Sequence, residues 1–129
     1  MHFKIVTIFP KELSISLSYG VVGNAINDNK IRIDYFDPRD HANNKHGSID
    51  DKPYGGGPGM VMQANPVLES IDQARDNSLD IPVFFLSPRG KTFDQNKAKE
   101  LSKMDKIILV SSRYEGLDQR AIDQTDNHE

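Results

Sequence analysis

The stretch that most constrains this chain is Asp50–Met60, which reads Asp-Asp-Lys-Pro-Tyr-Gly-Gly-Gly-Pro-Gly-Met. Four of its eleven residues are glycine and two are proline. Glycine loses the most backbone entropy on folding and proline donates no backbone hydrogen bond, so neither a helix nor a strand accommodates this run. The pattern is typical of a loop that presents bare backbone to a ligand or to another chain at close range.

Two common phosphate-binding loops do not fit this stretch. A Walker A loop would end in Gly-Lys-Ser/Thr, whereas Met60 and Val61 follow Gly59. A dinucleotide-binding loop would follow a strand and lead directly into a helix, but this run follows polar residues and contains Pro58. A flexible linker is disfavoured because the prolines and Tyr54 stiffen the run. We therefore interpret it as a binding loop of fixed shape.

Composition indicates one soluble globular domain. The chain has 129 residues, of which 36% are hydrophobic and 27% charged. No apolar run approaches the length of a membrane span, and the amino terminus lacks a signal-peptide pattern. The absence of cysteine excludes disulfides and thiolate metal sites and fits a cytoplasmic protein. The net charge of −3 argues against a protein coated in basic charge, although a local basic patch could still bind nucleic acid.

Apolar, β-branched runs alternate with helical patterns along the chain. Strands are predicted at Phe3–Phe9, Lys30–Phe36, Pro82–Leu86 and Lys106–Val110. Helices are predicted at Lys11–Tyr19 after Pro10, at Val22–Asn27, from a cap at Asn65 with Pro66 as first residue, at Asp94–Ser102, and from near Asp118. Asp37–Met62 has no periodicity, and the core is predicted to include Leu17, Leu68 and Ile71. This order predicts an α/β fold with a mostly parallel sheet flanked by helices.

Two of the predicted strands end in similar polar loops. Pro82–Leu86 leads into Ser87-Pro88-Arg89-Gly90, and Lys106–Val110 leads into the segment from Ser111 to Gly116. Ligands of open α/β sheets bind beyond the carboxyl ends of the strands. These two loops are therefore the expected walls of a pocket.

Several segments together resemble one enzyme family. Asp50–Met60, Leu86-Ser87-Pro88 with Gly90, and Arg113-Tyr114-Glu115-Gly116 look like the corresponding segments of the bacterial tRNA (guanine-N1)-methyltransferases, which belong to the SPOUT class. The family's amino-terminal pattern is matched by Ile8-Phe9-Pro10, Tyr19-Gly20 and Asp37-Pro38-Arg39-Asp40. The resemblance covers essentially the whole chain, in order.

The resemblance implies a function and a site. It implies transfer of a methyl group from S-adenosylmethionine to N1 of the guanosine 3′-adjacent to the tRNA anticodon, by a homodimer with a trefoil-knot fold. Cofactor-binding residues implied in this way are Leu86, Ser87, Pro88, Ser112, Tyr114, Glu115 and Gly116. Substrate-binding residues implied in this way are Asp50, Tyr54, Gly55, Gly56, Gly57, Pro58 and Gly59. A role for Mg²⁺ through RNA or cofactor stays open.

Methylation at N1 of guanine requires removal of a proton, hence a general base, and a cation near O6 helps. Asp50, Asp51 and Glu115 are carboxylate candidates, and Arg113 is a candidate donor. In the family, the aspartate base and a key arginine follow a segment that threads the knot, whereas this sequence stops at Glu129. The resemblance thus implies that residues 1–129 are a partial cofactor-binding domain, without the carboxyl-terminal tRNA-binding domain, and inactive alone. The alternative is a non-catalytic fragment that retains only dimerisation or weak RNA contact.

Plainer roles stay open for several of these residues. Asp50 and Asp51 could brace a turn, and Arg113 and Glu115 could pair with surface neighbours. Ser112 stands where the family usually has glycine, which places a side chain at a point of close backbone contact. The scattered histidines have no carboxylate partners at metal-ligand spacing, so no protein metal site is expected.

Overall fold

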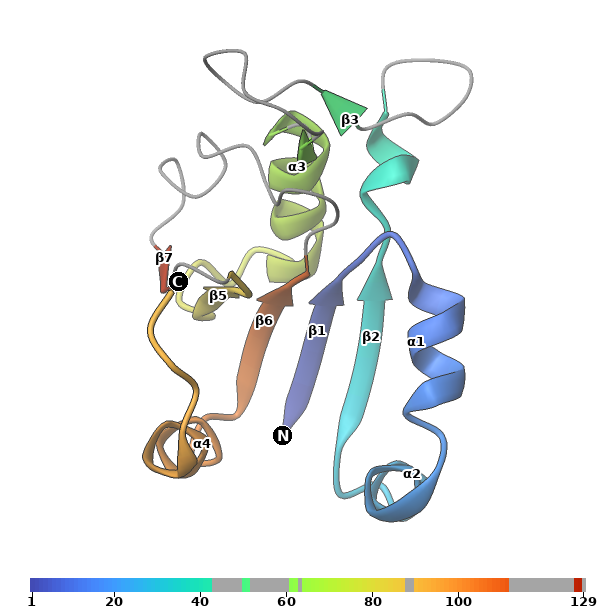
Figure 1. Cartoon of the computed structure of the whole chain (residues 1–129), viewed down its shortest axis with the longest axis vertical. Coiled ribbons are helices and arrows are strands. Elements are labelled where there is room, and N and C mark those ends of the chain that lie inside the picture. The colour runs from blue at the N-terminus through green and yellow to red at the C-terminus, as the bar shows by residue number, and fades with distance from the viewer. Residues whose placement is uncertain (43–49, 52–60, 63, 88–89, 112–126, 129) are drawn as a thin grey trace.

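The computed structural model describes residues 1–42, 50–51, 61–62, 64–87, 90–111 and 127–128. These contain a five-stranded sheet in the order β2-β1-β6-β5-β7, in which every neighbouring pair is parallel (Figure 1). The strands are β1 (His2–Val6), β2 (Arg32–Phe36), β5 (Val83–Phe85), β6 (Lys106–Val110) and β7 (Asn127–His128). The predicted α/β class with a parallel sheet is confirmed.

Five helical elements accompany the sheet in the described residues. They are α1 (Pro10–Ser16), α2 (Gly20–Asn27), the 3-10 helix η1 (Pro38–His41), α3 (Ala64–Arg75) and α4 (Gln95–Leu101). Pro10 opens α1 as predicted, and Asp94 caps α4 by accepting a hydrogen bond of 2.8 Å from the backbone N–H of Lys97. The helix predicted near Asp118 lies outside the described residues.

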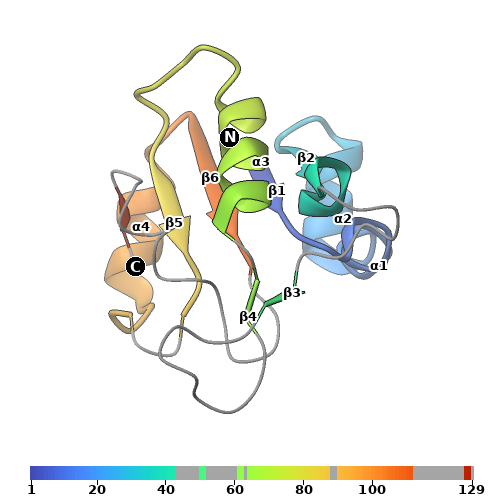
Figure 2. The same ribbon diagram turned by 90° about the horizontal axis from the view of Figure 1, so that it is seen from above.

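The register of the strands separates two faces of the sheet. Lys4 pairs with Asp34 and Ile108, and Val6 pairs with Phe36 and Val110, so these side chains share one face. The helix α3 covers that face and α4 lies on the opposite one (Figure 2). Such two-sided covering is what an all-parallel sheet requires.

The main core lies between α3 and the sheet. Val67, Ile71 and Ala74 of α3 are at most 1% exposed and pack against Val6, Val83 and Val110 of the strands, among others. The buried Lys4 ammonium donates a hydrogen bond of 2.5 Å to the carbonyl of Ala74, near the carboxyl-terminal end of α3. A cation there complements the partial negative charge of the helix end.

Some predictions about the core and the helix ends were wrong. Leu68 is partly buried against the core as expected. Leu17 is also partly buried but is not among the residues packed against the core, because it follows the last turn of α1, which buries no residue of its own. The helix α3 begins at Ala64, before the predicted cap Asn65. Ala64 is itself buried in the core, which favours the earlier start.

Asp37–Met62 is more regular than its sequence suggests. It contains η1 and a small antiparallel pair of β3 (Asp50–Asp51) with β4 (Val61–Met62). The Asp37 carboxylate accepts a hydrogen bond of 2.9 Å from the backbone N–H of Arg39. This bond closes a local turn, and such turns form without any periodic pattern in the sequence. Within the described residues, no helix is both long enough and apolar enough to span a membrane.

Candidate functional site

The candidate site lies at the edge of the sheet where the parallel strands end. Hydrogen bonds between the exit segments continue the pairing past the strand ends: Leu86 N–H donates to the Val110 carbonyl at 3.0 Å, and Ser111 N–H donates to the Val6 carbonyl at 2.9 Å. The segments that leave β5 and β6 therefore start side by side. This is the arrangement expected for the walls of a pocket beyond the carboxyl ends of strands.

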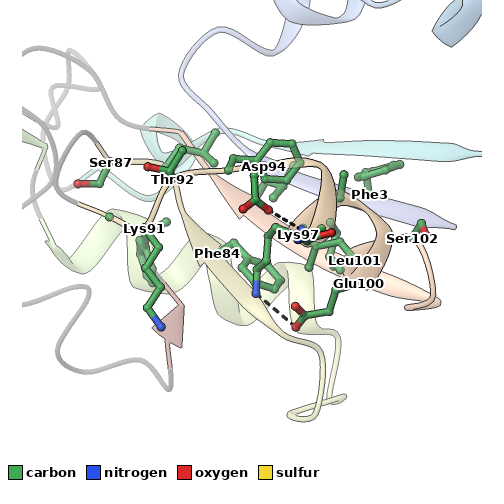
Figure 3. Close-up of a pocket in the computed structure, with 18 of the residues that line it drawn as sticks. Phe3, Phe84, Ser87, Lys91, Thr92, Asp94, Lys97, Glu100, Leu101 and Ser102 are labelled. Atoms are coloured by element: carbon green, nitrogen blue, oxygen red, sulfur yellow. Dashed lines mark hydrogen bonds and ion pairs between the residues drawn. The ribbon is translucent and has the colours of Figure 1, made fainter.

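A groove of about 1400 Å³ runs from this edge along the face of the sheet that carries α4 (Figure 3). Its end at the strand edge is lined by Leu86, Ser87 and Gly90, and its apolar floor includes Phe3, Ile107 and Leu109, together with Phe84. Small-molecule pockets typically measure about 300–1,000 Å³. The groove therefore exceeds what one small ligand fills, and only the end near Leu86 coincides with the predicted site.

Charged side chains of α4 and its approach rim the groove. The Lys97 ammonium lies 5.4 Å from the centre of the Phe84 ring and 3.3 Å from Glu100 Oε1. Figure 3 shows Lys91, Asp94, Lys97 and Glu100 around the opening, with both signs of charge present. This mixed rim gives no uniform basic surface for nucleic acid.

On the β1–β2 side of the same edge, Arg39 joins the ends of two strands. Its guanidinium donates to the Ile8 carbonyl at 2.8 Å and to Asp37 Oδ2 at 2.9 Å. The hydrogen bond to Asp37 raises the pKa of the Arg39 guanidinium above its ordinary value. The sequence alone did not identify Asp37 and Arg39 as a functional pair. An Asp-Pro-Arg sequence directly after a predicted strand nevertheless indicates a turn at the strand end, where ligands of such sheets bind.

The structure places only some of the predicted site residues. Leu86 is 54% exposed and Ser87 is half-buried, both at the strand edge of the groove. The backbone of Asp50 pairs with that of Met62. The other predicted cofactor-binding and substrate-binding residues lie outside the described residues: Pro88, Ser112, Tyr114, Glu115, Gly116, Tyr54, Gly55, Gly56, Gly57, Pro58 and Gly59, with the candidate donor Arg113.

The described residues contain no group of three or more His, Asp or Glu side chains arranged to hold a metal ion. Two histidine–carboxylate contacts occur among the described residues, His2–Asp34 at 2.7 Å on the sheet and His41–Glu69 at 3.2 Å between η1 and α3, and each brings together one histidine and one carboxylate. Neither offers the three or four ligands that a structural or catalytic metal takes.

Comparison with known proteins decides the family. All of residues 1–129 match the family described as tRNA (Guanine-1)-methyltransferase TrmD. The chain belongs to this tRNA (guanine-1)-methyltransferase family. The resemblance inferred from its sequence segments is thereby confirmed.

Individual members of the family are similar along nearly the whole chain. The chain is 47% identical over 122 residues to the tRNA (guanine-N(1)-)-methyltransferase of Buchnera aphidicola subsp. Acyrthosiphon pisum, covering 94% of this chain and 52% of that protein. It is 50% identical over 121 residues to the enzyme of the same name from Buchnera aphidicola subsp. Schizaphis graminum, covering 94% and 46%. The chain thus spans about half the length of the curated relatives it matches.

The fold is shared as well. The crystal structure of tRNA (m1G37) methyltransferase from Aquifex aeolicus superposes with a TM-score of 0.85 at 36% identity. The match covers 98% of this chain and 57% of that chain. The likeness in fold and sequence therefore covers nearly the whole chain.

Proposed function

We propose that this chain supplies the amino-terminal half of an S-adenosylmethionine-dependent methyltransferase that modifies N1 of the guanosine 3′-adjacent to the tRNA anticodon. The observation that carries the proposal is the family match over all 129 residues, in a chain whose parallel strands end side by side at a candidate pocket. The enzyme would act in the cytoplasm on tRNA. Its complete catalytic domain would form a trefoil knot.

The residues at the strand edge suit the adenosine part of the cofactor. Leu86 presents an exposed apolar side chain, while Ser87 and Gly90 offer a small polar group and accessible backbone beside it. An aromatic base with polar edges fits this combination of apolar surface and a few convergent polar groups. We propose Leu86, Ser87 and Pro88 on one side, and Ser112, Tyr114, Glu115 and Gly116 on the other, as the residues that hold it.

The bound cofactor would supply the methyl group. The chain's own contribution is to orient the guanine and to stabilise charge as the N1 proton leaves. We assign orientation of the substrate to Asp50, Tyr54 and the run Gly55–Gly59. We assign stabilisation of the negative charge that develops on O6 to the Arg113 guanidinium, with Glu115 as an assisting carboxylate. The base itself is expected in the half of the relatives that this chain does not span, so residues 1–129 alone should not turn over. Mg²⁺ could assist through the RNA or the cofactor.

Self-association is the second property that we propose. Ile15, Tyr19 and Val21, at the corner between α1 and α2, are 53%, 73% and 86% exposed. The helix α2 carries no charged residue, so two copies could meet there without like charges facing each other. This corner favours a homodimer, and it is compatible with the alternative of a non-catalytic fragment that retains dimerisation.

A methyl-transfer assay tests the proposal. The 129-residue chain and a version continued by the carboxyl-terminal half of a Buchnera aphidicola relative would receive radiolabelled S-adenosylmethionine and a tRNA with guanosine 3′ of the anticodon. We expect label in the tRNA only with the longer protein, and no label when that guanosine is replaced by adenosine. Absence of transfer by a folded, cofactor-binding longer protein would contradict the proposed reaction.

A further inference from the structure

The 3-10 helix η1 packs on α3, and the His41 side chain adds two polar contacts between them. The His41 ring lies between two residues of α3, with Nδ1 3.2 Å from Glu69 Oε2 and Nε2 3.2 Å from Gln73 Oε1. Glu69 and Gln73 are four residues apart, so they present adjacent side chains on one helix face. A doubly protonated ring donates to both oxygens, and a neutral ring keeps both contacts if the Gln73 amide turns over.

The other side of η1 is tied to the sheet. Arg39 reaches the Ile8 carbonyl at the end of β1, and Pro38 is fully buried. The short helix is thus held between the sheet edge and α3, with contacts to both. The packing of Ala42 against the core holds η1 near α3, and the His41 contacts are the polar contribution to that position, since the hydrogen bonds of the Arg39 and Asp37 side chains run towards the sheet and to each other.

The connectivity gives this contact a consequence. The helix η1 ends at His41 and α3 begins at Ala64, and between them β3 pairs with β4. His41, Glu69 and Gln73 therefore join the element that enters residues 43–62 to the element that leaves them. That span contains the residues proposed above to bind the substrate, from Asp50 to Gly59.

We propose that His41, Glu69 and Gln73 are positioning residues, which hold η1 against α3 and so set the geometry of the substrate-binding span. The functional half of this inference rests on the proposed tRNA methylation. The side chains of His41 and Glu69 are 24% and 56% exposed, so the contact contributes little to global stability. We therefore expect its effect in local hydrogen exchange and not in global stability.

Hydrogen exchange of the 129-residue chain, followed by mass spectrometry, tests the structural half. We expect His41→Ala to speed amide exchange of residues 43–62 by roughly twofold to fivefold, with exchange of β6 unchanged. His41→Gln should recover part of the protection, because an amide can still reach one partner. The matched control is His2→Ala, which removes a histidine–aspartate contact of 2.7 Å at the opposite edge of the sheet. It should leave exchange of residues 43–62 as in the parent chain.

The outcomes separate the two halves. Unchanged exchange of residues 43–62 in His41→Ala, or an equal rise in His2→Ala, overturns the inference. Binding of an anticodon stem-loop RNA with guanosine 3′ of the anticodon, and of S-adenosylmethionine, is then measured on the version continued by the Buchnera half. There, His41→Ala should weaken RNA binding by a similar factor and leave cofactor binding unchanged, and unchanged RNA affinity overturns the positioning role. If that parent protein does not bind the RNA at all, the proposed function fails. The exchange result would still show whether the His41 contacts protect residues 43–62.

Discussion

Substitution of Gly23, inside α2, offers a test in which two physical effects predict opposite changes in the free energy of unfolding. Alanine stabilises a helix interior by about 1 kcal/mol relative to glycine. At Gly23, however, a Cβ would lie 2.2 Å from the carbonyl oxygen of Ser18 and 2.4 Å from its carbonyl carbon. We predict that Gly23→Ala destabilises the protein, because the clash exceeds the gain in helix propensity.

The size of the effect follows from what must move. Real Cβ atoms essentially never approach another heavy atom within 3.0 Å, so Ser18 and Gly23 must separate by nearly an ångström. The obstacle is backbone, which cannot rotate away as a side chain could. Because the obstacle is backbone, the cost should lie in the upper part, about 2–3 kcal/mol, of the range typical of overpacking. Subtracting the gain of about 1 kcal/mol in helix propensity leaves a net loss of about 1–2 kcal/mol. For a chain of this size the melting temperature should fall by roughly 5 °C.

A neighbouring glycine provides the control. Gly20 has φ of +65° and no atom within 4 Å of its would-be Cβ, so its substitution costs conformational strain without a clash. Asparagine tolerates that backbone conformation. In urea unfolding followed by circular dichroism, Gly20→Asn should be more stable than Gly20→Ala, whereas Gly23→Asn should gain nothing over Gly23→Ala. A Gly23→Ala protein as stable as the parent would refute the reasoning.

Three further predictions concern the core, the surface and the site. Ile71→Ala should cost about 2–5 kcal/mol in urea unfolding, while Leu79→Ala, at an exposed side chain after α3, should change stability by less than about 0.5 kcal/mol; similar losses would place Ile71 outside the core. Val21→Glu should shift the chain to monomer in sedimentation equilibrium. Leu79→Glu, at an exposed side chain outside the corner between α1 and α2, should not. A parent chain that is already monomeric would contradict self-association. Leu86→Ala should weaken S-adenosylmethionine binding roughly fivefold to tenfold by calorimetry in the version continued by the Buchnera half, and unchanged affinity would remove Leu86 from the cofactor site.

The central strands of the sheet could be predicted because they are buried on both faces. Continuous apolar runs such as Ile107–Val110 are typical of that position. The first strand was predicted too long, to Phe9, because β-branched residues continue after the pairing with β2 and β6 stops at Val6. The order β2-β1-β6-β5 could not be read from the sequence, since it depends on which distant strands pair.

The candidate site was only partly predictable for the same reason. The loops after β5 and β6 were predicted as neighbours from a general property of parallel sheets, and the hydrogen bond from Leu86 to Val110 joins them. The contact of His41 with Glu69 and Gln73 requires knowing that η1 packs on α3, which no local pattern encodes. Lys4 likewise interrupts an apolar strand, and its burial makes sense only once the end of α3 lies above it.

The position of β6 between β1 and β5 also determines how the chain reaches its native state. β1 and β2 can pair as soon as residue 36 is available, but the other edge of β1 stays open until Lys106–Val110 arrives. Contacts between such distant segments make folding slow compared with proteins built from local contacts. During synthesis, an early intermediate would expose the unpaired edge of β1, and exposed edges of this kind invite association with other chains. Substitutions in β6 should therefore affect the yield of folded protein more than equally buried substitutions in α3.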